Sequence, residues 1–397
     1  MVAGRRVGLG VIGLGRGFTL MLPTFGRDER FRLAAATTPG AEARAAFTAE
    51  FDAPTYGDVA ALCRDPNVEA VYIASPHQFH ADHVAIAARA GKHILVEKPL
   101  AITLDEGEAM VAAARAAGVH MVVGPSHGFD APVLRARKII ASGEVGRLHM
   151  INAMNYTDFL YRPRRPEELD SARGGGVVFS QAVHQIDVAR LLGGGMVRTI
   201  RAMTGNWDPA RPTEGAYSLL MDFEDGAFAS LTYSGYGRFD SDEFMGWRGE
   251  LGRAKDPADY GRARRALSQA TNAEEEAALK RHCNYGSDGA GLSTDSPLPD
   301  AHEHFGLVVA SCEKADLRPM SNGVMIYGDS EARLDPLPPP AIPRAEVMDE
   351  IYEAVVNGTP PLHSGPWGLA TLEAALAILT SAREGREVRL ELQVSVN

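Results

Sequence analysis

The sequence predicts an α/β protein: a doubly wound parallel sheet at the N-terminus, followed by an α+β domain with a mostly antiparallel sheet. Over the first 124 residues, short apolar runs alternate with Ala-rich helical stretches, which is the rhythm of βαβ units. After Pro125 the alternating patterns of half-buried strands dominate, and Asp225-Gly226 gives a hairpin signal. We therefore expect two domains, 1–124 and 125–397.

The N-terminal domain is expected to hold five apolar strands separated by helices. Gly91 and Gly118 stand just past two of the helices, Ala81–Ala90 and Leu104–Ala117, where glycine commonly ends a helix. The strands are expected at Val7–Ile12, Leu33–Thr37, Val71–Ala74, Ile94–Val96 and Met121–Val123.

The C-terminal domain mixes helices with strands and carries an insertion near 236–300. The insertion combines a charged helical stretch, Pro257–Arg281, with a loop rich in Gly, Ser and Asp. The remaining helices are expected at Val133–Ala141, Gln181–Leu192, Arg344–Asn357 and Trp367–Glu384, and the strands at Leu148–Tyr156, Tyr217–Phe223, Ala227–Tyr233 and near Phe305 and Val324.

The bulk composition excludes several classes of protein. A content of 45% hydrophobic and 23% charged residues is that of a globular chain. A net charge of -11 repels nucleic acid and anionic membranes, and no apolar run reaches the roughly 18 residues that span a bilayer. The three widely spaced cysteines indicate free thiols rather than disulfides. We expect a cytoplasmic protein with a small-molecule substrate.

A Gly-rich turn is the first candidate site. The string Gly13-Leu14-Gly15-Arg16-Gly17 follows an apolar strand directly and precedes a helical stretch. There, glycines let the backbone approach a pyrophosphate, and the helix N-terminus supplies N–H donors. A turn that only joins strand to helix is the alternative, but the context favours a Rossmann nucleotide site. Its expected residues are Gly13, Gly15, Arg16, Gly17 and, at the sixth position of the fingerprint, Phe18.

The choice between NAD and NADP stays open. An acidic residue about 20 positions further on normally binds the ribose hydroxyls of NAD. Thr37 and Thr38 stand there instead, so no carboxylate repels the 2'-phosphate of NADP, and the threonine hydroxyls with Arg44 offer it a site. The expected cofactor is NAD or NADP.

Two further strings resemble the glucose-fructose oxidoreductase, inositol dehydrogenase and MocA (Gfo/Idh/MocA) family. They are ASPHQFH at 74–80 and AGKHILVEKP at 90–99. The resemblance covers essentially the whole chain apart from the charged insertion. It implies that Lys98 lies at the nicotinamide and that the cofactor side also includes Ser75, Pro76, His77, His80 and Glu97.

A third block carries the substrate side of the resemblance. The stretch from the glycines at 174–176 to Asp187 resembles a family helix, although Ser180 stands where the family often has aspartate. The strings at 155–162 and 302–305 further resemble the phthalate dihydrodiol dehydrogenase branch. The implied substrate residues are Tyr156, Arg162, Ser180, Gln181 and His184.

These residues predict a proton-transfer site. Oxidising an alcohol needs a hydride acceptor, a base for the hydroxyl proton and a stabiliser of charge on oxygen. His184 is the expected base, and Lys98 is the expected ammonium beside the hydroxyl. Asp187, one turn further, either orients the imidazole or faces the sheet. The hypothesis requires Lys98 from one domain and His184 from the other to converge at the cofactor.

The expected enzyme is an NAD(P)-dependent dehydrogenase acting on CH-CH or CH-OH groups. Its expected substrate is cyclic and hydroxylated, such as a cis-dihydrodiol of an aromatic carboxylic acid like phthalate, because aromatisation to a catechol makes the oxidation downhill. Arg162, Arg164 and Arg165 offer cations for carboxylates. A solvated basic loop is an equally weighted explanation of that cluster.

We expect no metal site. The spacing of His77, His80 and His83 resembles a ligand set only superficially, because no cysteine or carboxylate converges on it in the sequence. His302 and His304 flank Glu303 in the same loose way and are expected at the surface or in a pocket lining.

Two other functions remain open at the level of sequence. A sugar or inositol dehydrogenase fits the broader family, and a non-catalytic NAD(P)-sensing regulator fits the absent aspartate at position 180. The uncovered face of the predicted C-terminal sheet and the charged stretch favour a homo-oligomer, either a dimer or a tetramer.

Overall fold

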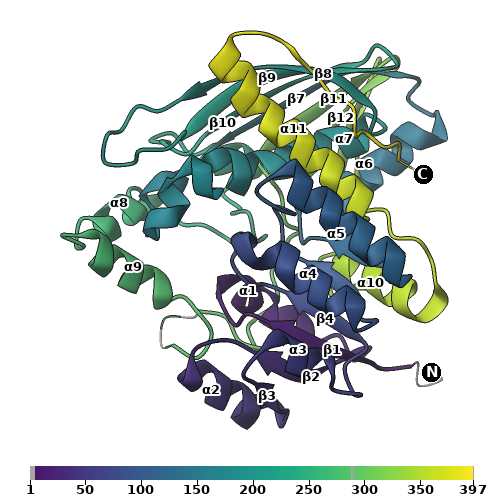
Figure 1. Cartoon of the computed structure of the whole chain (residues 1–397). Coiled ribbons are helices and arrows are strands. Elements are labelled where there is room, and N and C mark those ends of the chain that lie inside the picture. The colour runs from purple at the N-terminus through teal and green to yellow at the C-terminus, as the bar shows by residue number, and fades with distance from the viewer. Residues whose placement is uncertain (1–4, 288, 290, 397) are drawn as a thin grey trace. The chain divides into compact units, whose positions relative to one another are not determined.

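The computed structural model describes residues 5–287, 289 and 291–396, and the chain forms two compact units (Figure 1). The first unit comprises Met1–Pro125, Ala278–Leu298 and Ile342–Leu369, and the second comprises Ser126–Ala277, Pro299–Ala341 and Ala370–Asn397. Two stretches beyond residue 125 therefore pack with the N-terminal part, and neither unit is continuous in sequence.

The first unit contains a six-stranded sheet in which all neighbouring strands are parallel. In the order β3-β2-β1-β4-β5-β6, the chain adds strands on one side of β1 and then, from β4 onward, on its other side. This change of side is the doubly wound topology. The apolar runs of β1 and β4 are buried throughout, as expected for strands covered on both faces. The strands are β1 (Val7–Ile12), β2 (Phe31–Thr37), β3 (Thr55–Tyr56), β4 (Ala70–Ile73), β5 (His93–Val96) and β6 (Met121–Val123).

Helices join the parallel strands, and local signals set their ends. In α5, the Thr103 hydroxyl accepts a hydrogen bond from the Glu106 N–H, and Gly118 closes the helix with a φ of 66°. The helices of this unit are α1 (Arg16–Phe25), α2 (Ala41–Phe51), α3 (Val59–Cys63), α4 (His80–Arg89), α5 (Leu104–Ala117) and α10 (Ala345–Asn357).

The second unit contains a nine-stranded sheet of order β14-β13-β12-β11-β7-β10-β9-β8-β15. Neighbours are antiparallel except β7 and β10, which run parallel. The predicted hairpin at Asp225-Gly226 joins β9 to β10, and β10 lies between β9 and β7. The predicted fold class is confirmed. The strands are β7 (Leu148–Tyr156), β8 (Val197–Gly205), β9 (Ala216–Phe223), β10 (Phe228–Ser234), β11 (Leu307–Cys312), β12 (Ala315–Met320), β13 (Gly323–Gly328), β14 (Ala332–Pro336) and β15 (Val388–Arg389).

Helices cover one face of this sheet, and one of them carries the predicted base His184. Helix α6 (Ala131–Ser142) packs on β12 and β13, and α7 (Val183–Leu192) packs on β7 and β10. All ten residues of α7 are buried. The long helix α11 (Gly365–Glu384) follows later in the chain.

The charged insertion folds into two short helices rather than one long one. They are α8 (Arg262–Leu267) and α9 (Ala273–Arg281). Glu276 of α9 accepts hydrogen bonds from the Arg211 guanidinium and from the backbone N–H of Arg164, each at 2.7 Å. Both arginines are buried, so these contacts anchor Glu276, which belongs to the second unit.

Candidate active site

The Gly-rich turn lies at the carboxyl edge of the parallel sheet. Gly13 has a φ of 98°, and its N–H donates to the carbonyl of Thr37 at the end of β2. A Cβ at this position would lie 2.8 Å from the Ser75 backbone nitrogen, so only glycine fits. Helix α1 begins at Arg16, directly after this turn.

The turn fits a dinucleotide pyrophosphate. A Cβ on Gly15 would meet only the Asn284 side chain, at 3.9 Å, among the described residues, so the backbone can be approached closely there. The N–H groups that begin α1 supply donors for phosphate oxygens. Gly17 lets the Glu97 carboxylate approach the helix, because a Cβ there would lie 3.2 Å from Glu97 Oε1.

Phe18 does not present its side chain to this turn. Its ring is fully buried and packs against Phe25, Phe47, Phe51 and Tyr285. A small residue at this fingerprint position normally allows helix and strand to pack closely. Here the ring fills an aromatic core instead, so any contact of Phe18 with a cofactor is limited to its backbone.

The other predicted cofactor residues lie at the same sheet edge. Thr37 is buried, and Thr38 follows β2, where the Arg44 guanidinium donates to the carbonyls of Thr38 and Pro39 at 2.6 and 2.8 Å. Ser75, Pro76 and His77 follow β4. The carboxyl ends of β1, β2 and β4 meet at the topological reversal, where doubly wound sheets bind dinucleotides.

His80 is a buried link between two loops. Its Nε2 lies 3.0 Å from the Ser75 carbonyl oxygen, and its Nδ1 lies 3.1 and 3.2 Å from those of Pro99 and Leu100. The ring is 1% exposed, which leaves it little surface for a ligand. Burial lowers its pKa to about 4.

Glu97 and Lys98 follow β5. The Tyr72 hydroxyl donates to Glu97 Oε1 at 2.7 Å, and burial raises the pKa of Glu97 despite the opposing charge of Lys98. This contact fixes the turn that carries Lys98. Lys98 belongs to the first unit and His184 to the second, so their convergence stays a prediction.

In the second unit, a π-helical turn followed by α7 carries three of the five predicted substrate residues, Ser180, Gln181 and His184. The turn Val178–Ala182 carries Ser180, which is half-buried, and Gln181, whose Oε1 accepts from the Tyr233 hydroxyl at 3.3 Å. His184 is buried in the first turn of α7. Asp187 accepts a hydrogen bond from the Ser126 hydroxyl, which is a contact to a neighbouring segment of the same unit.

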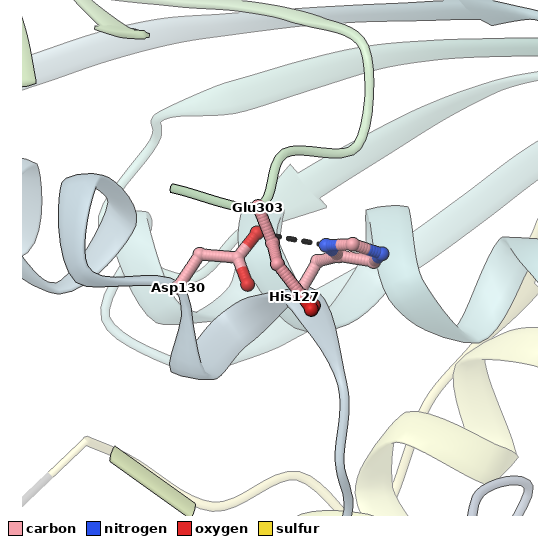
Figure 2. Close-up of side chains that lie close together, drawn as sticks. All are labelled: His127, Asp130 and Glu303. Atoms are coloured by element: carbon pink, nitrogen blue, oxygen red, sulfur yellow. Dashed lines mark hydrogen bonds and ion pairs between the residues drawn. The ribbon is translucent and has the colours of Figure 1, made fainter. Parts of the chain in front are cut away.

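Two rings contact His184. His127 lies edge-on, with ring centroids 4.8 Å apart and planes at 66°, and Phe305 lies 4.9 Å away. Asp130 Oδ2 is 2.7 Å from His127 Nδ1, and Glu303 completes a group whose polar atoms lie within 4.8 Å of one another (Figure 2). Burial lowers the pKa of His127, but the charge and hydrogen bond of Asp130 outweigh it and raise the pKa above its ordinary value.

The arginine cluster is mostly engaged inside the protein. Arg164 is buried over the Phe159 ring, and burial lowers its pKa to about 10. Arg162 binds Asp158 at 3.1 Å and approaches Glu250 at 3.8 Å, yet its side chain is 41% exposed. Tyr156 ends β7 with its N–H bonded to Ser241 Oγ. Arg165 is likewise paired, with Glu167 and Glu168, and its side chain is 33% exposed, so Arg162 is the most exposed of the three arginines.

Sequence patterns did not place His127 beside His184, and they gave Phe305 only as part of the string at 302–305. His127 and Asp130 lie in a short turn before α6, and Phe305 lies far along the chain before β11. The one local signal was the His127-Gly-Phe-Asp130 spacing ahead of a helix start. Tyr233, which bonds Thr157 at 2.7 Å and faces Gln181, also lacked any motif.

Both units match models of one protein family. Residues 7–125 match its oxidoreductase model with an NAD-binding Rossmann fold, and residues 133–254 match its C-terminal domain model. The chain belongs to the Gfo/Idh/MocA family. This Gfo/Idh/MocA protein is therefore an oxidoreductase with an NAD-binding first unit, which confirms the predicted family, enzyme class and nicotinamide cofactor.

Individual relatives cover nearly the whole chain. The 1-carboxy-3-chloro-3,4-dihydroxycyclohexa-1,5-diene dehydrogenase of Comamonas testosteroni is 46% identical over 376 residues, 94% of each chain. A crystal structure from Bordetella bronchiseptica RB50, described as a candidate dehydrogenase, is 41% identical with a TM-score of 0.90, covering 97% of this chain and all of that one. The aldose-aldose oxidoreductase of Caulobacter crescentus shares the fold at 22% identity and a TM-score of 0.72, covering 97% of this chain and 100% of its own.

Within the described residues of this Gfo/Idh/MocA protein, none of the helices combines the length and apolar character that a bilayer crossing demands. 

Proposed function

We propose that this oxidoreductase oxidises a cyclic cis-dihydrodiol of an aromatic carboxylic acid, such as phthalate, to the corresponding catechol. The observation that supports it most is the 46% identity, over 94% of both chains, to a dehydrogenase whose named substrate is a carboxylated dihydroxycyclohexadiene. Such a substrate loses a hydride from carbon and a proton from oxygen, and the resulting ketone enolises to a catechol.

Different residues of the chain take separate roles in this oxidation. A nicotinamide held by the first unit would supply the hydride acceptor. His184 takes the hydroxyl proton, and the Lys98 ammonium stabilises the charge that develops on the same oxygen. Gln181, held by Tyr233, and Ser180 orient the diol by hydrogen bonds. Arg162 keeps its charge, since Glu250 and Asp158 raise its pKa against the effect of burial, and it attracts the substrate carboxylate.

A substrate panel followed by the absorbance of reduced cofactor tests this proposal. We expect turnover of carboxylated cis-dihydrodiols, and no comparable turnover of sugars or inositols. Lys98→Ala and His184→Ala should each lower kcat by about a hundredfold or more while cofactor binding persists. Near wild-type turnover in both variants would remove the assigned roles.

Two alternatives give different results in the same assays. A sugar or inositol dehydrogenase would turn over polyols, as the aldose-aldose oxidoreductase with the same fold suggests by its name. A non-catalytic sensor would bind NAD(P) tightly and turn over none of the panel. Kinetics with NAD and with NADP settle the preferred cofactor.

We also propose a cytoplasmic homo-oligomer assembled on the uncovered sheet face. Met203, Leu220 and Phe228, on the adjacent strands β8, β9 and β10, are 71%, 57% and 46% exposed. Apolar side chains gathered on one face favour association. Light scattering should give a dimer or tetramer that Leu220→Glu weakens, and a monomeric wild type at micromolar concentration would contradict the proposal.

A further inference from the structure

His127 contacts the proposed base directly. The two imidazoles meet edge to face at 4.8 Å, both are buried, and Phe305 packs on both rings at 4.8 and 4.9 Å. The described neighbours therefore hold the His184 ring between one aromatic and one titratable side chain.

The charged groups around this pair favour a proton on His127. Asp130 lies 2.7 Å from its Nδ1, and Glu303 and Glu250 from other segments of the unit also act on it. On α7 itself, the Asp187 carboxylate is bonded to Ser126. Two contacting imidazolium rings repel each other, so charge on His127 disfavours charge on His184.

We propose that His127, held by Asp130, is a positioning residue for the oxidation: it fixes the orientation of the His184 ring and keeps that ring neutral, ready to accept the hydroxyl proton. This inference rests on the proposed role of His184 as the base. It assigns a function to a residue outside every motif of the sequence. The same repulsion speeds the departure of the proton from His184 after hydride transfer.

The pH profile of kcat/KM tests the inference with the full-length protein. His127→Gln removes a positive charge beside the base, so the acid limb of the profile should move up by about one pH unit, with the high-pH plateau largely retained. At pH values below this limb, kcat/KM of His127→Gln should be about tenfold lower than that of wild type. His127→Lys restores a positive charge, and its limb should return toward the wild-type position.

Matched controls separate charge from folding. His149→Gln makes the same change at an exposed position of β7 and should leave the profile unaltered. Thermal unfolding and NAD binding identify variants that fail to fold. If His127→Gln is one of them, Asp130→Asn, which removes the carboxylate that favours charge on His127, should move the limb in the same direction. A uniform loss of rate at all pH values, with the limb fixed, would show a purely structural role and overturn the proposal.

Two further results would overturn different claims. If His184→Gln keeps wild-type turnover, the proposed function fails at the base itself, whatever His127 does. Loss of rate on dialysis against a chelator, restored by Mn²⁺ and absent in Glu303→Gln, would reassign His127, Asp130 and Glu303 to a cation and also overturn the proposal.

Discussion

His80 Nδ1 lies 3.1 Å from the carbonyl oxygen of Pro99, so a buried imidazole on α4 braces the turn that carries Lys98. The same ring reaches Ser75 through Nε2. The family resemblance placed His80 among the cofactor residues. A neutral imidazole carries one N–H, so the buried ring donates to one of these two loops and packs against the other.

Replacing His80 should change the stability of the protein in acid. Because burial lowers its folded pKa to about 4, from an ordinary value of 6.5, the unfolded chain binds the proton more readily. The contribution of His80 to the free energy of unfolding is complete above about pH 6.5 and falls by about 3 kcal/mol as the pH drops toward 4. His80→Gln should flatten this part of the curve of unfolding free energy against pH. An unchanged slope would contradict the assignment.

The glycines of the turn should separate folding from cofactor binding. Gly13→Ala forces a Cβ to 2.8 Å from backbone at a φ of 98°, so we expect a loss of stability of about 1–3 kcal/mol. Gly15→Ala meets only Asn284 at 3.9 Å and should fold normally, yet bind NAD more weakly. Calorimetric unfolding and fluorescence titration with NADH measure the two effects. Equal NADH affinity of Gly15→Ala and wild type would place the pyrophosphate elsewhere.

The Phe18 core should depend on a distant segment. Tyr285 packs on Phe18 with ring centroids 5.1 Å apart, and its hydroxyl donates to Glu50 at 2.6 Å. Tyr285→Ala removes the ring and should destabilise the first unit by about 3 kcal/mol, whereas Tyr285→Phe should cost about 1 kcal/mol. Denaturant unfolding, monitored by the loss of NADH binding, measures the stability of the first unit. Similar values for the two variants would argue against ring packing.

The His127–Asp130 pair should stabilise the protein more in mild acid than in base. Burial opposes charge on His127, but Asp130 raises its folded pKa above 6.5, so the contribution is complete below 6.5 and is lost as the pH rises through the folded value. His127→Gln should therefore be more destabilising at about pH 6 than at about pH 9 in urea unfolding. A difference of the opposite sign would mean that burial dominates.

Local patterns predicted much of the fold. The strand-helix rhythm gave β1, β4, β5 and β6 with only small shifts in their ends, because apolar periodicity and glycine stops act within a few residues. The parallel pairing of β7 with β10 was not expected, since it depends on how a hairpin inserts between distant strands. The charged stretch of the insertion broke into α8 and α9.

The candidate site was only partly predictable. Motifs identified Gly13, Lys98 and His184 because each lies in a recognisable string. Glu303 and Phe305 reach His127 from 176 and 178 positions away in the sequence, and no spacing rule connects such residues. The aromatic core beneath Phe18 was hidden for the same reason.

The discontinuous first unit limits how this enzyme can be dissected or recombined. Because residues 278–298 supply the Tyr285 ring and 342–369 supply the strand partner Ser364 of β6, a fragment cut at residue 125 would expose apolar surface where both should dock. A chimera that exchanges nucleotide modules between relatives must transplant three pieces of the gene together.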